Sequence, residues 1–290
     1  MFVTSFEWAL GAMRGLRSRS SGRRLACSAA ALLFLAGTAS LSVAASINYG
    51  SFIGNTVTYV NVTEDTNTGD PLPLFGSPTV IGDSIDFDPI GFSAQSSGGG
   101  VDITDGQLKF MVVAKSDPST DFAIDSISFA EAGDTTLAGM GTDATFTAVA
   151  AYVFIDIQEV DGVGINPIKL LKSLVFNPSG GTYGLGTDGG GGPYYTTSWT
   201  GSLLVDLTQA LIDKGVKYDL GVTKMSVNID NVLVAISQPH TYSVIAKKDF
   251  GGLSVTVNQP GQGEIPEPTS IALALVGLAL VAVRRARYGS

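Results

Sequence analysis

ATFTAVAAYVFIDI (residues 144–157) and KMSVNIDNVLVAI (residues 224–236) are the two longest strand-like runs of this chain. Both are rich in Val, Ile, Thr and aromatic residues, either continuously apolar or alternating with polar residues, as buried and half-buried strands do. Eight shorter runs of the same kind are spaced along the chain: Thr56–Val62, Ser84–Phe87, Gln107–Ala114, Phe122–Phe129, Ser173–Phe176, Ser198–Leu204, Tyr242–Ala246 and Leu253–Val257.

Turn-forming residues separate these runs, for example at 68–71 and 97–100. One helix is predicted, with Asp206 as its N-cap, Leu207 to Lys214 as its body and Gly215 as its stop. Some ten strands and one helix predict an all-β fold: a single jelly-roll-like β-sandwich ectodomain over residues 46–259. A β-solenoid is the alternative, although no fixed repeat is visible.

Charge and cysteine usage exclude several functions. All eight arginines lie near the two ends, and residues 46–268 hold nine lysines against 25 carboxylates, a formal charge of −16. Such an acidic segment repels phosphate backbones, so we expect no nucleic-acid partner. The single cysteine, Cys27, precedes the ectodomain. We therefore expect no disulfide, cysteine-ligated zinc or cysteine nucleophile there.

The N-terminus has the order of a secretory signal peptide. Five arginines between Arg14 and Arg24 precede the apolar run Leu25–Ala39, and small residues close it at Val43-Ala44-Ala45. We predict a signal peptide over residues 1–45, cleaved before Ser46. An uncleaved anchor is the alternative, and translation could start at Met1 or Met13.

The C-terminus is a second membrane-directed segment. A linker over 260–265 leads to Pro266, Glu267 and Pro268. An apolar span over 269–283, which we predict to be a transmembrane helix, follows, and then a basic end over 284–287 containing Arg284, Arg285 and Arg287. Fifteen helical residues cover about 22 Å, short for a hydrocarbon core of about 30 Å. Flanking arginines can snorkel, and arginines beside both apolar segments place the middle of the chain outside the cytoplasm.

This tail resembles the PEP-CTERM sorting signal of Gram-negative bacteria that make extracellular polymeric matrix. The resemblance covers residues 264–287 and implies processing by exosortase, with Pro266, Glu267 and Pro268 as the recognition element and the arginines as the anchor. It also implies transient attachment to the inner membrane and a final place at the cell envelope, the outer surface or the extracellular matrix. The stretches Asp86–Phe92 and Ala246–Phe250 resemble parts of uncharacterised ectodomains that carry this tail.

Two acidic segments, both predicted to be loops, suggest a cation site. Asp83, Asp86 and Asp88, and then Asp102 and Asp105, offer the oxygen ligands that Ca²⁺ prefers, although neither group matches an EF-hand loop. Structural calcium is one hypothesis, and solvated turn aspartates are the other.

Aromatic residues beside a glycine-rich loop suggest sugar binding. Trp199, Tyr194 and Tyr195 could stack on sugar rings of a matrix polysaccharide, or Trp199 could pack in the core.

We expect no enzyme. Gly184–Gly189 matches the dinucleotide fingerprint, but the glycines and Pro193 that follow cannot start the helix it requires. His240, the only histidine, lies in a predicted turn, and glutamates for glycoside hydrolysis are few. The sequence therefore favours a non-enzymatic exported surface or matrix protein, with a carbohydrate-binding module as the alternative and a glycan-active enzyme third.

Overall fold

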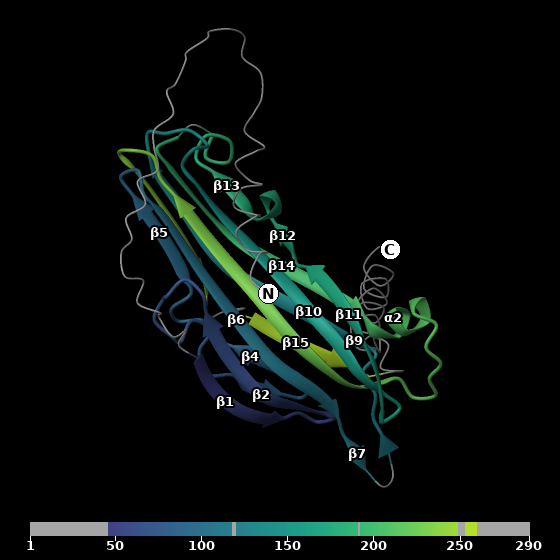
Figure 1. Ribbon diagram of the computed structural model, residues 1–290. Helices are drawn as coiled ribbons and strands as arrows, with labels where there is room; N and C mark the ends of the chain where they lie inside the picture. The colour runs from purple at the N-terminus through teal and green to yellow at the C-terminus, as the bar shows by residue number, and fades with distance from the viewer. Residues whose placement is uncertain (1–45, 118–119, 191, 249–252, 260–290) are drawn as a thin grey trace, which may run out of the picture. The chain divides into compact units, whose positions relative to one another are not determined.

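The computed structural model describes residues 46–117, 120–190, 192–248 and 253–259. Within them the protein is all-β, with two antiparallel sheets, as predicted (Figure 1). The predicted signal peptide, linker and sorting tail lie outside the described residues. None of the described helices has the length and apolar character needed to cross a membrane.

The first sheet has the strand order β1-β2-β6-β15-β10-β11, and the short strand β13 also pairs with β10. Its strands are β1 (Ser46–Ile53), β2 (Val57–Thr66), β6 (Val101–Ala114), β10 (Phe146–Val160), β11 (Val163–Ser173), β13 (Thr182–Gly184) and β15 (Val222–Ile236).

The second sheet is built around β9, which pairs with β14 on one side and with both β16 and β17 on the other. β5 continues the sheet beyond β16, β4 continues it beyond β17, and β3 and β12 are its edges. Its strands are β3 (Thr79–Ile81), β4 (Ser84–Phe87), β5 (Ser93–Ser97), β9 (Ser126–Gly139), β12 (Val175–Asn177), β14 (Tyr194–Asp206), β16 (Thr241–Lys247) and β17 (Leu253–Asn258). A two-stranded ribbon, β7 (Ser116–Asp117) with β8 (Thr120–Asp121), and the short turn η1 (Ser179–Gly181) complete the β structure.

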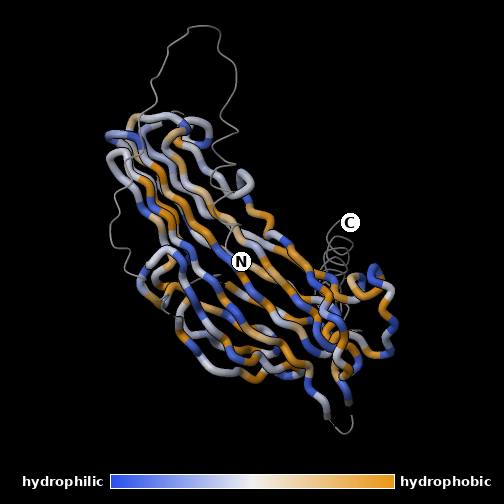
Figure 2. The backbone as a smooth tube through the Cα atoms, viewed as in Figure 1, coloured by the Kyte–Doolittle hydropathy of each residue, from blue (hydrophilic) through white to orange (hydrophobic). Residues whose placement is uncertain are grey.

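The two longest predicted runs form adjacent central strands, β10 and β15, paired from Phe146 opposite Ile236 to Val160 opposite Val222. Burial alternates along most strands, and the hydropathy of neighbouring residues alternates with it (Figure 2). The inward residues join one hydrophobic core, in which each buried Val, Leu, Ile or Phe contributes about 1.5–3 kcal/mol.

The predicted helix is confirmed as α2 (Leu207–Asp213). The carboxylate of Asp206 accepts a hydrogen bond from the Gln209 N–H, and Gly215 follows the helix with φ +67°. The sequence missed the strands β1, β3, β5, β11 and β13 and the β7–β8 ribbon. β11 contains Pro167, which would be unfavourable in a central strand, but the structure places it on a sheet edge, where a missing N–H breaks no ladder.

Candidate functional site

In the second sheet, two positions beside β9 are each filled by two short strands placed end to end. β16 and β17 fill the position next to β9, and β5 and β4 fill the position beyond them. β9 pairs with β17 through residues 126–131 and with β16 through residues 133–139. β4 and β5 divide the next position in the same way, since β4 pairs with β17 and β5 pairs with β16. β4 ends at Phe87 and β5 begins at Ser93, while β16 ends at Lys247 and β17 begins at Leu253. Residues 249–252 lie outside the described residues.

Phe92 ends the 88–92 segment between β4 and β5 by turning into the core. Its carbonyl accepts a hydrogen bond from the Lys247 N–H at 3.0 Å, which joins the end of the 88–92 segment to the end of β16. Its ring is buried and packs edge-on against Phe75, with the ring centres 4.9 Å apart. A Cβ at Gly106 would lie 2.6 Å from Phe92 Cε2, so the glycine in β6 makes room for this ring.

Lys247, the last residue of β16, forms a buried ion pair with Glu131 of β9. Its Nζ donates to Glu131 Oε2 at 2.5 Å, and neither side chain has any exposed surface. Both residues fall on the inward face, since burial alternates through Thr241, Ser243, Ile245 and Lys247 on one strand. The pair therefore lies inside the domain, not on its rim.

Aromatic rings enclose the ammonium group on two sides. Lys247 Nζ lies 5.3 Å from the ring centre of Phe92 and 5.6 Å from that of Trp199, within range of cation–π attraction. Gly133 of β9 pairs with Lys247 on one side and with Trp199 on the other. A Cβ there would overlap the indole ring, so only glycine lets Trp199 and Lys247 meet across β9.

Burial governs the electrostatics of this pair. It lowers the pKa of Lys247, and the carboxylate of Glu131 opposes that change only in part. Glu131 Oε1 and the Trp199 indole N–H are buried without a hydrogen-bond partner in the described part of the chain. A buried ion pair is weak as a source of stability, but removing one partner typically costs about 3–5 kcal/mol.

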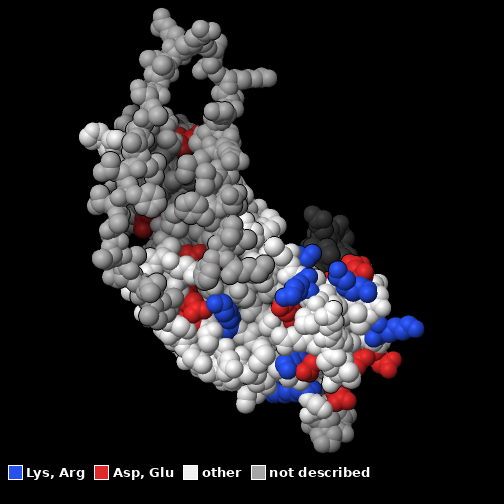
Figure 3. Space-filling view, in the orientation of Figure 1, with Lys and Arg blue, Asp and Glu red and all other residues white. Residues whose placement is uncertain are grey.

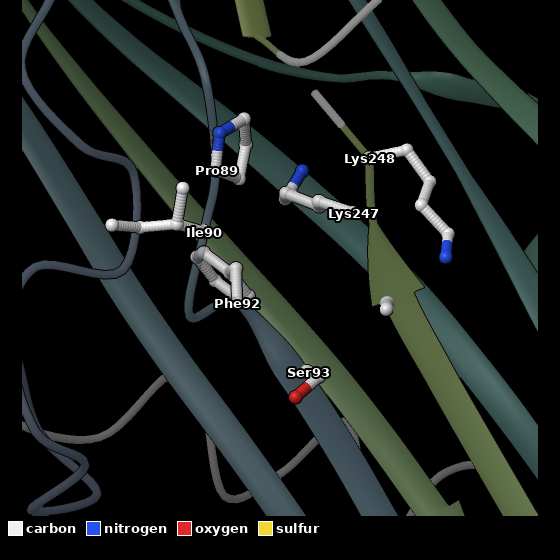
Figure 4. Close-up of a pocket in the computed structure, with 7 residues that line it drawn as sticks. Pro89, Ile90, Phe92, Ser93, Lys247 and Lys248 are labelled. Carbon is white, nitrogen blue, oxygen red and sulfur yellow. The ribbon is translucent and has the colours of Figure 1, made fainter. Parts of the chain in front are cut away.

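An open hollow of about 320 Å³ lies beside Lys247, and Figure 4 shows Pro89, Ile90, Phe92 and Ser93 on one side of it and Lys247 and Lys248 on the other. In this view the Lys247 side chain is directed toward the 89–92 segment, while Lys248 extends to the other side of its strand. Lys248 instead pairs with Asp134, at 3.0 Å. The residues lining the hollow are Pro89, Ile90, Phe92, Ser93, Ala246, Lys247 and Lys248.

The hollow brings together Asp86–Phe92 and the described part of Ala246–Phe250, the two stretches singled out in the sequence. Sequence reasoning considered only Asp86 and Asp88 of these stretches, as calcium ligands, and it missed both Lys247 and Glu131. The sequence did contain a signal for this site. Glu131 is two residues from Phe129 and from Gly133, and Lys247 is two residues from Ile245, so each charge shares the inward face of its strand. A charge at such a position needs a partner.

The predicted calcium ligands do not form one cluster. Asp83 lies in the β3–β4 turn, where its carboxylate accepts hydrogen bonds from the N–H and hydroxyl of Thr56 and from the Val57 N–H. Asp86 lies within β4, and burial followed by the charge of Asp88 raises its pKa. Among the described residues no group of three or more His, Cys, Asp or Glu side chains is placed to hold a metal.

The prediction that Asp102 and Asp105 lie in a loop is wrong, because both belong to the long strand β6. Asp102 accepts a hydrogen bond from the Gln95 N–H at 2.7 Å. Asp105 is buried beneath the segment after β2, where the Asn67 amide donates to it. Burial, together with the nearby charge of Asp230, raises the pKa of Asp105 to about 6.

The aromatic residues proposed for sugar binding are separated by burial. Trp199 is 1% exposed and packs edge-on against Phe176, so it offers no ring face to a sugar. Tyr194 is 61% exposed at the start of β14, and Tyr195 packs partly against the core.

The two motifs set aside in the sequence are turns. His240 is exposed between β15 and β16, with φ +65°. Gly184–Gly189 is closed by the Asp188 carboxylate, which accepts from the Gly184 N–H, and no described helix follows it directly.

Charges on the visible face are mixed (Figure 3). Most of its lysines lie toward the end of the sheets that carries α2, among carboxylates. Two of the ion pairs, Lys169–Asp156 and Lys224–Glu159, link neighbouring strands of the first sheet.

No protein-family model matches this chain, and no curated protein matches it. Among solved structures, it aligns with infectious bursal disease virus of the Gx strain at 12% identity and TM-score 0.17, covering 79% of this chain and 60% of that chain. It aligns with the VP2 subviral particle of the same virus at 13% identity and TM-score 0.10, covering 81% of this chain and 61% of that chain. This chain thus spans about 60% of the length of those chains, and TM-scores this low carry no argument.

Proposed function

We propose that this chain is a non-enzymatic exported protein of the cell surface or extracellular matrix, sorted through Pro266-Glu267-Pro268. The support is the order of the ends in the sequence: a signal-type segment, then a domain, then a Pro-Glu-Pro tail with an apolar span and arginines. A β domain with one extensive core suits a stable exported scaffold.

We also infer that the domain is a jelly-roll sandwich. One layer has the order β4/β5, β16/β17, β9, β14, and the other β6, β15, β10, β11. We count β4 with β5, and β16 with β17, as one strand each. From β5 to β16, each strand then lies in the other layer from the strand before it, except that β10 and β11 share a layer. This alternation is the connectivity of eight-stranded jelly rolls.

The sorting proposal is tested by replacing Pro266, Glu267 and Pro268 with alanine in a host that has an active exosortase. The wild-type protein should lose its tail, and the variant should retain it, as read by mass spectrometry of the exported protein. The control is Gly261→Ala combined with Gly263→Ala, since both residues lie in the linker outside the triad. Identical tail processing in the triad variant would refute sorting through it.

A carbohydrate-binding module is the alternative function, and the burial of Trp199 weighs against it. Tyr194 is the remaining exposed aromatic residue of that group. If the module binds matrix polysaccharide through this face, Tyr194→Ala should weaken pull-down by the host's polysaccharide, while Ile212→Ala on the exposed side of α2 should not. Equal pull-down by both variants would remove this face as the binding site.

Structural calcium at Asp83, Asp86 and Asp88 stays a proposal. If the ion is bound, a chelator should lower the melting temperature and added Ca²⁺ should restore it, because a ligand of the folded state stabilises it. An unchanged melting temperature would mean that these aspartates act through hydrogen bonds such as those of Asp83 with Thr56.

A further inference from the structure

We propose that Lys247 and Glu131 become joined by an intramolecular amide bond, formed by the folded chain itself. The two residues lie 116 positions apart, on the neighbouring strands β16 and β9, and meet inside the domain. The bond would lock these two strands together at the level where β16 ends. This inference does not depend on the sorting tail or on any ligand.

The reacting groups are already in contact. Lys247 Nζ lies 2.5 Å from Glu131 Oε2, and because that oxygen is bonded to Cδ, the nitrogen is held close to the carbon it would attack. Groups fixed in such a geometry react with effective molarities of up to about 10⁵–10⁸ M. Contact inside a fold therefore replaces the external activation that an amine and a carboxylic acid need in water.

The surroundings favour the uncharged reactants. Burial lowers the pKa of Lys247, which favours the neutral amine that the step requires. The rings of Phe92 and Trp199 flank the nitrogen, and the Trp199 indole N–H is a buried donor without a partner in the described residues.

The reaction balances without any further reagent. The ammonium of Lys247 gives one proton to Glu131 Oε2, which leaves a neutral amine and a carboxylic acid. The Nζ lone pair forms a bond to Cδ, the C–OH bond breaks, and the hydroxyl leaves with a second proton from Nζ as one water. Lys247 lines the open hollow, which gives this water a route out.

Such a bond would serve a domain without cysteine. Residues 46–290 contain none, so no disulfide can cross-link this β domain after export. An amide between β9 and β16 would supply a covalent link that reducing agents do not break.

Peptide mapping of the folded wild-type chain tests the proposal. Trypsin cuts after Lys115, Lys169, Lys224 and Lys248 but not after an acylated Lys247. Peptides 116–169 and 225–248 should therefore appear as one species, lighter than their sum by one water, with fragment ions that place the link between Glu131 and Lys247. Separate peptides of full mass in the wild-type protein would overturn the proposal, and this result requires no variant to fold.

Two matched substitutions identify the nucleophile. Lys247→Arg keeps the charge but removes the amine, so the linked species should disappear, whereas Lys248→Arg makes the same change one residue along and should preserve it. A water loss that persists in K247R would contradict the proposal, because the Asp161-Gly162 step inside peptide 116–169 can lose water by itself. A link from Lys247 to the buried amide of Asn231, which would release ammonia instead of water, would overturn the assignment to Glu131.

Discussion

Trp199 and Lys247 lie on opposite sides of Gly133 in the second sheet, and the absent side chain lets the ammonium approach to 5.6 Å from the indole ring centre. All three residues are on the inward face of the sheet. The contact that encloses the buried lysine thus depends on a residue that contributes no side-chain atoms. Gly133 is as much a part of the site as the charged pair.

Gly133→Ala should destabilise the domain. Its Cβ would overlap Trp199 and the Ala246 carbonyl oxygen, and forcing extra volume into a packed core typically costs about 1–3 kcal/mol. Chemical denaturation measures the change in the free energy of unfolding. Gly164→Ala in the edge strand β11 is the matched control, since a Cβ there meets no atom within 4 Å. Equal stability of the two variants would contradict the role given to Gly133.

Lys247→Met should cost at least about 3–5 kcal/mol of stability, because it leaves Glu131 buried without its partner and also removes the proposed amide link. Replacing both partners, as Lys247→Met with Glu131→Leu, should recover part of that loss because no unpaired charge remains. Lys248→Met is the control: its pair with Asp134 is exposed, and such pairs contribute about 0–1 kcal/mol. Thermal melts of the four proteins give the comparison, and a double variant no more stable than the single one would argue against an electrostatic cause.

The sequence predicted the strands and the helix cap better than it predicted the site. Alternation in residues 144–157 and 224–236 is a local signal, and so is the Asp206 cap, so both could be read from neighbouring residues. The site is not local. Lys247 meets Glu131 only because β16 pairs with β9, and Trp199 reaches the pair only because β14 lies on the other side of Gly133. Strand pairing over such separations leaves no pattern within one run of residues.

Asp206→Ala should destabilise the domain by about 1 kcal/mol, because the Gln209 N–H at the start of α2 loses its acceptor. Asp206→Asn keeps a side-chain oxygen that can accept this hydrogen bond, so it should cost much less. The free energy of unfolding from denaturant titration distinguishes the two. Equal losses would mean that the negative charge, and not the hydrogen bond, is what stabilises the first turn.

Asp105 should make the domain less stable as the pH rises from about 4 to about 6. Its pKa is raised to about 6 in the folded protein, mainly by burial and then by Asp230, against about 3.9 in an unfolded chain. Between these values the folded state binds more protons than the unfolded state, so the free energy of unfolding falls as pH rises through this window. Burial also raises the pKa of Asp230, which adds to the same trend, while the charge of Lys109 opposes it.

Asp105→Asn should flatten this dependence, because an amide cannot ionise. The free energy of unfolding of the variant minus that of wild type should therefore be larger at pH 7 than at pH 4. Gly164→Ala, which changes no titratable group, is the control and should leave the pH profile unchanged. Denaturant titrations at pH 4, 5, 6 and 7 follow the effect. A difference in the free energy of unfolding between wild type and D105N that stays the same at all four pH values would contradict the raised pKa of Asp105.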